Sequence, residues 1–358
     1  MATAPPELAR FRETVDEALT GAVAVAVERL TATHARLAPL ADELAAFVLA
    51  AGKRLRPALV LIGWEAAGHE ELRPAVGPAL AVELVHTCAL VHDDLIDDAD
   101  VRRGRPAAHH AFADRHARAG WAGTADTFGR AAALLLGDLA FVAADELFLR
   151  AADDGVPADR VLAALRVFTT LREEVTAGQF LDVVAQSSGV NDPDLALTIA
   201  TYKSGRYSVA RPLELGALLG GAPELAAGLA RAGLPLGTAF QLRDDVLGVF
   251  GREEETGKST LSDLAEGKRT LLVALTAGRL EDAERRRFEA LLGDPRLDES
   301  GAKELRRLMR ASGALAETER RAAALVDEAL HELASLAVPS ATRSALEGLA
   351  RFLVARRG

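Results

Sequence analysis

The chain has 358 residues, of which 49% are hydrophobic, so it can bury a large core. Its net charge of −10 argues against non-specific binding to nucleic acid, and its single cysteine, Cys88, excludes a disulfide within the chain. The first twelve residues lack the apolar core of a signal peptide, and no uncharged apolar run is long enough to span a bilayer. The composition therefore predicts a soluble, cytoplasmic protein without stable membrane insertion.

Alanine and leucine dominate and β-branched runs are short, so the sequence predicts an all-α chain that begins with two helices over residues 1–50. A basic turn follows, with the sequence GKRLRP. Gly52 lets the backbone turn there, and Pro57 suits the first turn of the next helix. Lys53 and Arg56 then lie near a helix N-terminus, where the amides and the dipole attract anions. The alternative is an ordinary basic turn at the surface.

The next helix is expected to begin near Pro78 and to end in an acidic motif, within the run ELVHTCALVHDDLIDDADVRRG. Asp93 and Asp97 lie one helical turn apart, with Asp94 beside them. Such carboxylates raise each other's pKa unless a cation lies between them, and the helix dipole near a C-terminus disfavours negative charge. They suit Mg²⁺ bound together with a phosphate, although acidic motifs are as often solvated helix faces.

The middle of the chain predicts a helix over 130–151, a long helix to about residue 187 and another that starts at Asp192-Pro193. Lys203-Ser204-Gly205 interrupts that last helix, as either a solvated segment or a phosphate contact. Pro223 and Pro235 are expected to bracket a further helix, which leads into a second acidic helix that ends near Gly251.

The second acidic pair, Asp244-Asp245, again ends an apolar run and is again followed by basic residues. Two such pairs, each followed by basic residues, indicate a binding site rather than two solvated helix faces. The two helices could face each other across a central cavity, because helix bundles build metal and ligand sites from facing helices. Residues 252–268 are expected to form a polar loop, and amphipathic helices follow from 270 to the end. No linker or break in composition divides the chain, so we predict one domain over 1–358.

Together these features resemble the trans-isoprenyl diphosphate synthases, the polyprenyl synthetase family. GKRLRP, DDLID followed by RRGRP, Lys203-Ser204, QLRDD and GK…GKRT occur in the order and spacing of that family, from about residue 45 to residue 275. The resemblance implies the all-α isoprenoid-synthase fold, a helical bundle around a central cavity, and a homodimer. It also implies Mg²⁺-dependent chain elongation. In that reaction an allylic diphosphate ionises, isopentenyl diphosphate attacks the carbocation, and loss of a proton to the released diphosphate restores an alkene.

The resemblance also assigns residues to roles. About three Mg²⁺ ions are implied, held by Asp93, Asp97 and Asp244, with Asp94 and Asp245 supporting them. The allylic diphosphate would contact Arg102, Lys203, Ser204 and Lys258. Isopentenyl diphosphate would contact Lys53, Arg56, His86 and Arg103. Gln241, Asp182 and Lys268 are expected to be supporting or lid residues. One departure is that Gly248 replaces the third aspartate of the family's second motif, and the loop between Lys258 and Asp263 leaves open which residue matches a family loop aspartate.

In this family, side chains below the first acidic motif form a floor under the growing hydrocarbon. Cys88 and Ala89, five and four residues before Asp93, are small, and Val85 one turn deeper is modest in size. No aromatic ring blocks the pocket at these positions, so the resemblance predicts geranylgeranyl diphosphate (C20) as the product. A farnesyl or a longer-chain product is the alternative.

Three other classes of protein share part of this pattern. A class I terpene cyclase shares the fold and one acidic motif, but it needs neither a second diphosphate site nor the second acidic pair. A phosphohydrolase that uses His92-Asp93 would need further histidines at ligand spacing. An inactive regulatory subunit of a heteromeric prenyl synthase stays possible because of Gly248, although intact Asp93 and Lys53 argue against it.

Overall fold

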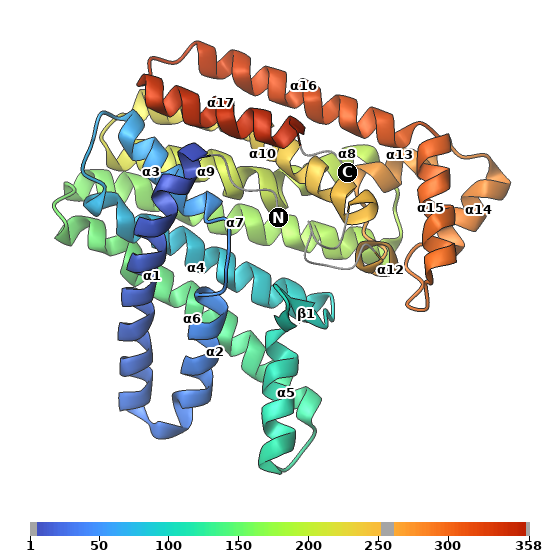
Figure 1. Cartoon of the computed structure of the whole chain (residues 1–358), viewed down its shortest axis with the longest axis horizontal. Coiled ribbons are helices and arrows are strands. Elements are labelled where there is room, and N and C mark those ends of the chain that lie inside the picture. The colour runs from blue at the N-terminus through green and yellow to red at the C-terminus, as the bar shows by residue number, and fades with distance from the viewer. Residues whose placement is uncertain (1–5, 252–260, 356–358) are drawn as a thin grey trace. The chain divides into compact units, whose positions relative to one another are not determined.

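The computed structural model describes residues 6–251 and 261–355, which are almost entirely helical (Figure 1). By their internal contacts they form two compact units. The N-terminal unit comprises residues 8–61 and 70–161, and the C-terminal unit comprises mainly residues 62–69 and 162–355. The predicted all-α class is confirmed, and the single domain over 1–358 stays a prediction.

The N-terminal unit is built around a buried central helix, α4 (Arg73–Ile96), which lies beside α6 (Ala125–Asp153). Its other elements are α1 (Pro6–Thr33), η1 (Ala35–Leu37), α2 (Ala38–Val48), the start of α3 (Leu55–Ala66), a hairpin of β1 (Val101–Arg102) and β2 (Arg105–Pro106), and α5 (Ala108–Ala119). Gly77 allows α4 and α6 to approach closely, because a Cβ on it would lie 2.5 Å from the carbonyl oxygen of Leu147.

The prediction that α4 begins near Pro78 was wrong. The helix begins at Arg73, where Pro74 supplies the first-turn proline, and Pro78 lies inside it. Within the described residues α4 is the only helix long and apolar enough to cross a membrane, and 72% of its apolar window is buried in the protein. The apolar character of α4 is therefore that of a core helix.

The C-terminal unit packs its helices around α10 (Pro223–Phe250), which contacts η2 (Ala200–Ala210), α9 (Arg211–Leu219) and α16 (Ala314–Ala334). Its other helices are α7 (Ala158–Ser188), α8 (Pro193–Ile199), α12 (Ser262–Ala265), α13 (Leu271–Arg279), α14 (Asp282–Leu291), α15 (Glu299–Ala311) and α17 (Ser340–Ala355). The amphipathic C-terminal helices are thus confirmed. The helix boundary expected at Pro235 was wrong, because α10 continues through this residue, which is buried in the contacts that hold the helix.

The interruption expected at Lys203 is a π-helix, η2, rather than a break. Two neighbouring helices approach its backbone through glycines. A Cβ on Gly178 of α7 would lie 2.2 Å from the Lys203 nitrogen, and a Cβ on Gly237 of α10 would lie 2.2 Å from the Gly205 carbonyl oxygen. Wide π turns recur at functional sites, and this one holds the backbone of Lys203 against α7 and that of Gly205 against α10.

Candidate active site

The first acidic motif lies at the C-terminal end of α4, where Asp97 is the cap residue. The side chains of Asp93 and Asp97 are half-buried, whereas Asp94 is fully buried. Arg102 Nε donates to Asp94 Oδ1 at 2.7 Å, and Arg102 Nη2 lies 3.8 Å from Asp93 Oδ2. The predicted grouping of these four residues is therefore present, with Asp94 turned inward to hold the arginine.

A tight hairpin returns Arg102 to the motif. Its two turn residues, Arg103 and Gly104, have φ values of 54° and 75°, as a two-residue turn with the twist of the flanking strands requires. Glycine adopts this conformation freely, whereas Arg103 is held in it by its surroundings. The RRG run is thus a turn that places Arg102 at the acidic motif, while the next arginine, Arg103, lies near the Ala50 carbonyl oxygen.

A cation cluster, which we define as Arg56, His86 and Arg103, lies beside this motif. Burial and the nearby charges of Arg56 and Arg103 lower the pKa of His86 well below its ordinary value, and Arg102 adds to the effect. Burial also lowers the pKa of Arg103, which has Arg54 and Arg102 near it. Positive groups that disfavour one another's charge in this way form a site that an anion would stabilise. Lys53 is exposed just before α3, on the same turn as Arg56.

The second acidic motif lies on α10, and the C-terminal unit gathers its predicted partners around it. Gln241 Nε2 donates to Asp245 Oδ1 at 2.6 Å, and Lys203 Nζ donates to Asp182 Oδ2 on α7 at 2.6 Å. Burial, together with the charges of Asp263, Asp244 and Asp182, raises the pKa of Asp245 to about 7 although Gln241 lowers it. A carboxylate whose pKa is raised by other carboxylates would be stabilised by a bound cation.

The raised pKa predicts how stability depends on pH in the absence of metal. In the unfolded chain Asp245 loses its proton near the ordinary pKa of 3.8, but in the folded chain only near 7. The folded state therefore holds the extra proton in this range, and the free energy of unfolding falls as the pH rises from about 4 to about 7. We expect Asp245→Asn to raise the melting temperature at pH 8 and to change it much less at pH 4.5. Equal shifts at both pH values would contradict the assignment.

The structure shows what lies beside Gly248, where the family's third aspartate is missing. A Cβ on Gly248 would lie 2.0 Å from Asp263 Oδ2, so the Asp263 carboxylate occupies the space that a side chain at 248 would need. Asp263 also lies 3.4 Å from Lys268 Nζ, which in turn contacts Glu266 at 2.9 Å. A carboxylate from α12 thus stands next to the second motif. The sequence alone leaves the match of Asp263 open, because residues 252–268 are expected there to form a polar loop.

This arrangement predicts what happens when the carboxylate is moved from position 263 to position 248. Asp263→Ala should lower turnover about 10-fold or more, as loss of a supporting carboxylate does at metal sites. Gly248→Asp alone should also lower activity, because its side chain collides with Asp263. The double variant Gly248→Asp, Asp263→Ala should recover part of the loss in steady-state assays. Wild-type turnover in Asp263→Ala would show that this carboxylate is not used.

The donor set fits a divalent metal that arrives with a ligand. Within residues 6–251 and 261–355, no three histidine, cysteine or acidic side chains converge well enough to hold a metal by themselves. Asp94 Oδ2 is nevertheless buried with no hydrogen-bond partner, and the carboxylates around Asp245 repel one another. Mg²⁺ is commonly bound by one or two carboxylates and completed by phosphate oxygens and water. Lys258, a predicted diphosphate contact, lies outside the described residues.

Comparison with known proteins now identifies the chain. The family model for polyprenyl synthetase matches residues 38–309. A short chain isoprenyl diphosphate synthase of Methanothermobacter thermautotrophicus is 35% identical over 69% of this chain and 69% of its own length. A crystal structure of a Corynebacterium glutamicum geranylgeranyl pyrophosphate synthase, complexed with isoprenyl diphosphate and magnesium, has 34% identity and a TM-score of 0.92, covering 97% of this chain and 99% of that one.

The chain therefore belongs to the polyprenyl synthetase family and is a trans-prenyltransferase. Relatives differ in the product that they are named for. A (2E,6E)-farnesyl diphosphate synthase of Mycobacterium tuberculosis is 35% identical over 86% of this chain and 80% of its own length. The octaprenyl diphosphate synthase of Escherichia coli is 31% identical over 98% of this chain and 99% of its own length. Family membership thus leaves the product length open.

Proposed function

We propose that this enzyme condenses isopentenyl diphosphate with allylic diphosphates in the presence of Mg²⁺ and makes geranylgeranyl diphosphate. The observation that carries the proposal is that the N-terminal unit has two sites of different chemistry. One is the acidic motif with Arg102, and the other is the cation cluster, which suits a diphosphate without a metal. A substrate that ionises needs metal at its leaving group, whereas a substrate that only attacks needs binding alone.

Each residue has a physical role in this reaction. Bound Mg²⁺ would neutralise the charge that develops on the leaving diphosphate; in the N-terminal unit Asp93 and Asp97 would hold it, and in the C-terminal unit Asp244 would do so. Arg102 adds fixed positive charge beside the first acidic motif and pairs with Asp94, and Lys203 adds it beside the second motif and pairs with Asp182. Each of these two cationic side chains is thus held near its own acidic motif before the substrate binds.

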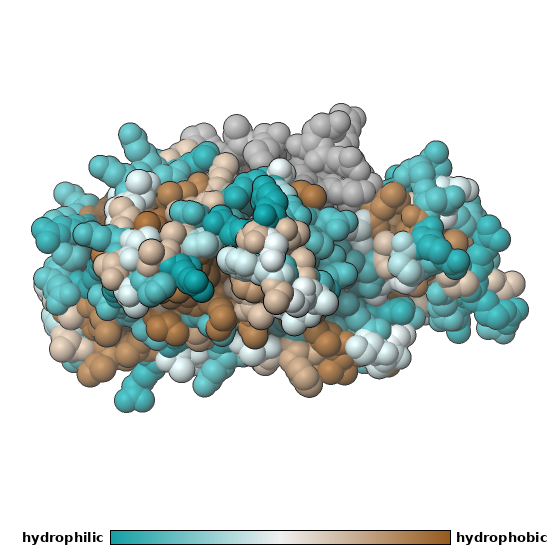
Figure 2. Space-filling model, turned by 90° about the horizontal axis from the view of Figure 1, so that it is seen from below, coloured by the Kyte–Doolittle hydropathy of each residue, from teal (hydrophilic) through white to brown (hydrophobic). Residues whose placement is uncertain are grey.

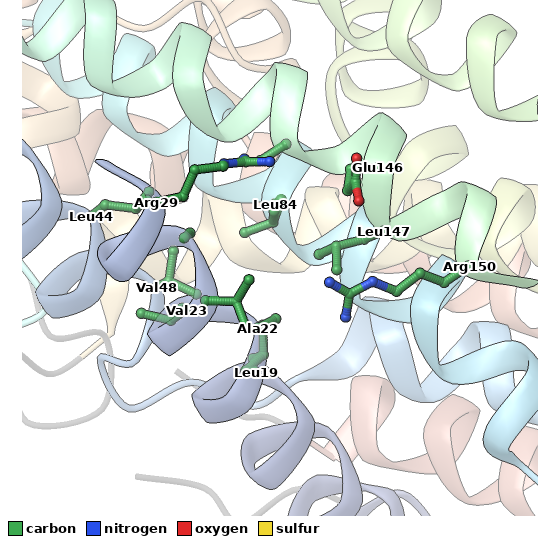
Figure 3. Close-up of a pocket in the computed structure, with 13 residues that line it drawn as sticks. Leu19, Ala22, Val23, Arg29, Leu44, Val48, Leu84, Glu146, Leu147 and Arg150 are labelled. Carbon is green, nitrogen blue, oxygen red and sulfur yellow. The ribbon is translucent and has the colours of Figure 1, made fainter. Parts of the chain in front are cut away.

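The product length is argued from the lower part of α4. Ala89 is half-buried, whereas Cys88 and Val85 are buried. Deeper in the unit, Leu84 lines an apolar pocket of about 60 Å³ between α1, α2, α4 and α6, where Leu19, Val23 and Leu147 turn toward the same space (Figure 3). Leu84 separates this pocket from the small residues Cys88 and Ala89 along α4 only by one helical turn, and we take it as the residue that ends the space available to the product. The small side chains near Asp93 support a C20 product.

We also propose that a second copy of this chain covers the outer face of α6. Leu134, Leu135, Val142 and Leu149 are 48–66% exposed along this one helix. Figure 2 shows hydrophobic patches among hydrophilic side chains on one face of the molecule. A row of large apolar side chains that follows one helix over several turns is typical of an interface. A two-fold dimer would bury the row against itself.

The dimer proposal predicts a change in mass. Val142→Asp, together with Leu135→Asp, should shift the protein from twice the chain mass of 37.7 kDa toward the monomer in light scattering after size exclusion. Val25→Asp is the matched control, because Val25 on α1 is 55% exposed but lies off the row. A wild-type monomer, or a dimer that survives both charges, would contradict the proposal.

The reaction class is tested by what triggers diphosphate release. With Mg²⁺ and geranyl diphosphate alone, an elongating enzyme should release little inorganic diphosphate, and addition of isopentenyl diphosphate should start the release. A terpene cyclase would release it at the full rate without the second substrate. Absence of release with any pair of substrates would favour a regulatory subunit.

A further inference from the structure

Arg54 lies in the basic turn between Lys53 and Arg56, but its guanidinium is used inside the protein. Its side chain is 3% exposed. Nε donates to Asp16 Oδ1 at 2.8 Å, Nη1 donates to Glu83 Oε1 at 2.6 Å, and Nη2 donates to the carbonyl oxygens of residues 48 and 50 at 3.0 and 3.1 Å. Four of the five N–H donors of a guanidinium are thereby engaged. Arg54 is therefore not available to contact a substrate.

The backbone of Arg54 is also unusual. Its φ of 47° lies in the left-handed region, where Cβ crowds the following carbonyl oxygen. A non-glycine residue keeps this conformation only where its surroundings hold it. Here the side chain itself supplies the hold, because it binds the end of α2 on one side and Glu83 of α4 on the other. The path of the turn therefore depends on the contacts of this one guanidinium.

The same contacts connect the turn to the cation cluster. Glu83 stands three residues before His86 on α4, so the two side chains lie on neighbouring parts of one face. Arg103 Nη1 lies 3.5 Å from the carbonyl oxygen of Ala50, to which Arg54 also donates. The Arg103 guanidinium further lies 3.6 Å from the position that a Cβ on Gly52 would take. The Arg54–Glu83 ion pair thus joins the basic turn to the face of α4 that carries His86, and Arg103 lies against the same turn at Ala50.

The opposite charges of Arg54 and Glu83 strengthen the contact between the basic turn and α4. Burial alone lowers the pKa of Arg54, but Glu83 and Asp16 raise it, so its pKa lies above the ordinary value and the guanidinium keeps its charge. Glu83 is 4% exposed at its side chain, and a buried carboxylate left without its arginine is strongly disfavoured. The turn cannot move away from α4 without breaking this pair.

We propose that Arg54, paired with Glu83, is a positioning residue for the binding of isopentenyl diphosphate. It touches no substrate, and it acts by holding Arg56 of the cation cluster, together with Lys53, at the face of α4 that carries His86. This inference rests on the proposed function, because it takes the cation cluster to be the site of that diphosphate.

The test uses the full-length protein with Arg54→Lys, which keeps the charge but replaces a planar fork by one compact ammonium group that cannot reach four acceptors. Titration calorimetry with isopentenyl diphosphate, without metal or allylic substrate, should show the dissociation constant rising about 10-fold or more. In steady state the KM for isopentenyl diphosphate should rise likewise, while the KM for the allylic diphosphate stays within about two-fold. Glu83→Gln should shift the same constants in the same direction.

Two controls separate positioning from general loosening. Leu80→Ala empties a buried site on the same helix, and Asp16→Asn alters the solvent-exposed partner of Arg54; both should leave the dissociation constant within about two-fold. An unchanged constant in Arg54→Lys overturns the proposal, as does an equal rise in a Leu80→Ala protein with a similar fall in melting temperature. If the wild type neither binds nor elongates isopentenyl diphosphate, the proposed function fails instead. Inorganic diphosphate, titrated into wild type and Arg54→Lys, then decides the positioning role separately.

Discussion

Asp93→Ala should reduce turnover by about three orders of magnitude or more while leaving the melting temperature close to that of the wild type. Asp93 is half-buried at the end of α4, with Arg102 Nη2 3.8 Å away and the helix dipole disfavouring its charge. Its removal takes a ligand from the metal that neutralises the leaving diphosphate, and loss of one such electrostatic contact costs a large part of the rate. Its removal also relieves local repulsion, so stability should change little.

The matched control for this variant is Asp98→Ala, five residues further along the same acidic run. Asp98 is 66% exposed at its side chain and pairs with Arg130 on α6. We expect it to lose little turnover. Single-turnover kinetics at saturating Mg²⁺, with melting curves on the same samples, provide the comparison. Near wild-type turnover in Asp93→Ala would show that the metal assignment is wrong.

Ala89→Phe should shorten the product from C20 to C15. Ala89 is half-buried four residues before Asp93, and a phenyl ring there would fill the space that the predicted C20 chain needs beyond its third isoprene unit. The expected change is in product length, with turnover of the shorter chain retained. Ala89→Ser, which keeps the volume, is the control and should leave the product unchanged. An identical product distribution in Ala89→Phe would place the floor on another helix.

The structure separates Cys88 from Ala89, although the sequence treats them alike. Cys88 is 7% exposed, and its Sγ lies 3.6 Å from Nδ1 of His92, whose Nε2 lies 3.1 Å from the Leu134 carbonyl oxygen on α6. A phenyl ring at 88 would enter this packed contact between α4 and α6. We therefore expect Cys88→Phe to lower stability in addition to any change in the product.

Much of the site could be predicted because its signals are local. The spacing of Asp93 and Asp97 places both on one helix face whatever the rest of the chain does, and the structure keeps that arrangement. Asp192 and Pro193 begin α8 as expected, because a cap and a first-turn proline act within one turn. The amphipathic helices expected from residue 270 onward are likewise present in the C-terminal unit, because their periodicity is also a local signal.

The parts that could not be predicted depend on distant partners. From the sequence alone, Arg54 is one more cation in a basic turn. Its structural role depends on its hydrogen bonds to Asp16 and Glu83, which are 38 and 29 residues away in the chain. Pro78 and Pro235 break helices by local rules, but here the packing of α4 and α10 outweighs the lost hydrogen bond. Each of these errors comes from a tertiary contact that overrides a local preference.

The most direct measurement is the size of the product. Purified protein would be incubated with Mg²⁺, labelled isopentenyl diphosphate and, in turn, the C5, C10 and C15 allylic diphosphates, and the products would be dephosphorylated and separated by chromatography. We predict a dominant C20 alcohol from all three primers. A C15 alcohol or a much longer one would keep the reaction and overturn the account of the pocket below Asp93. No elongated product, with hydrocarbon formed from a prenyl diphosphate alone, would contradict the central claim.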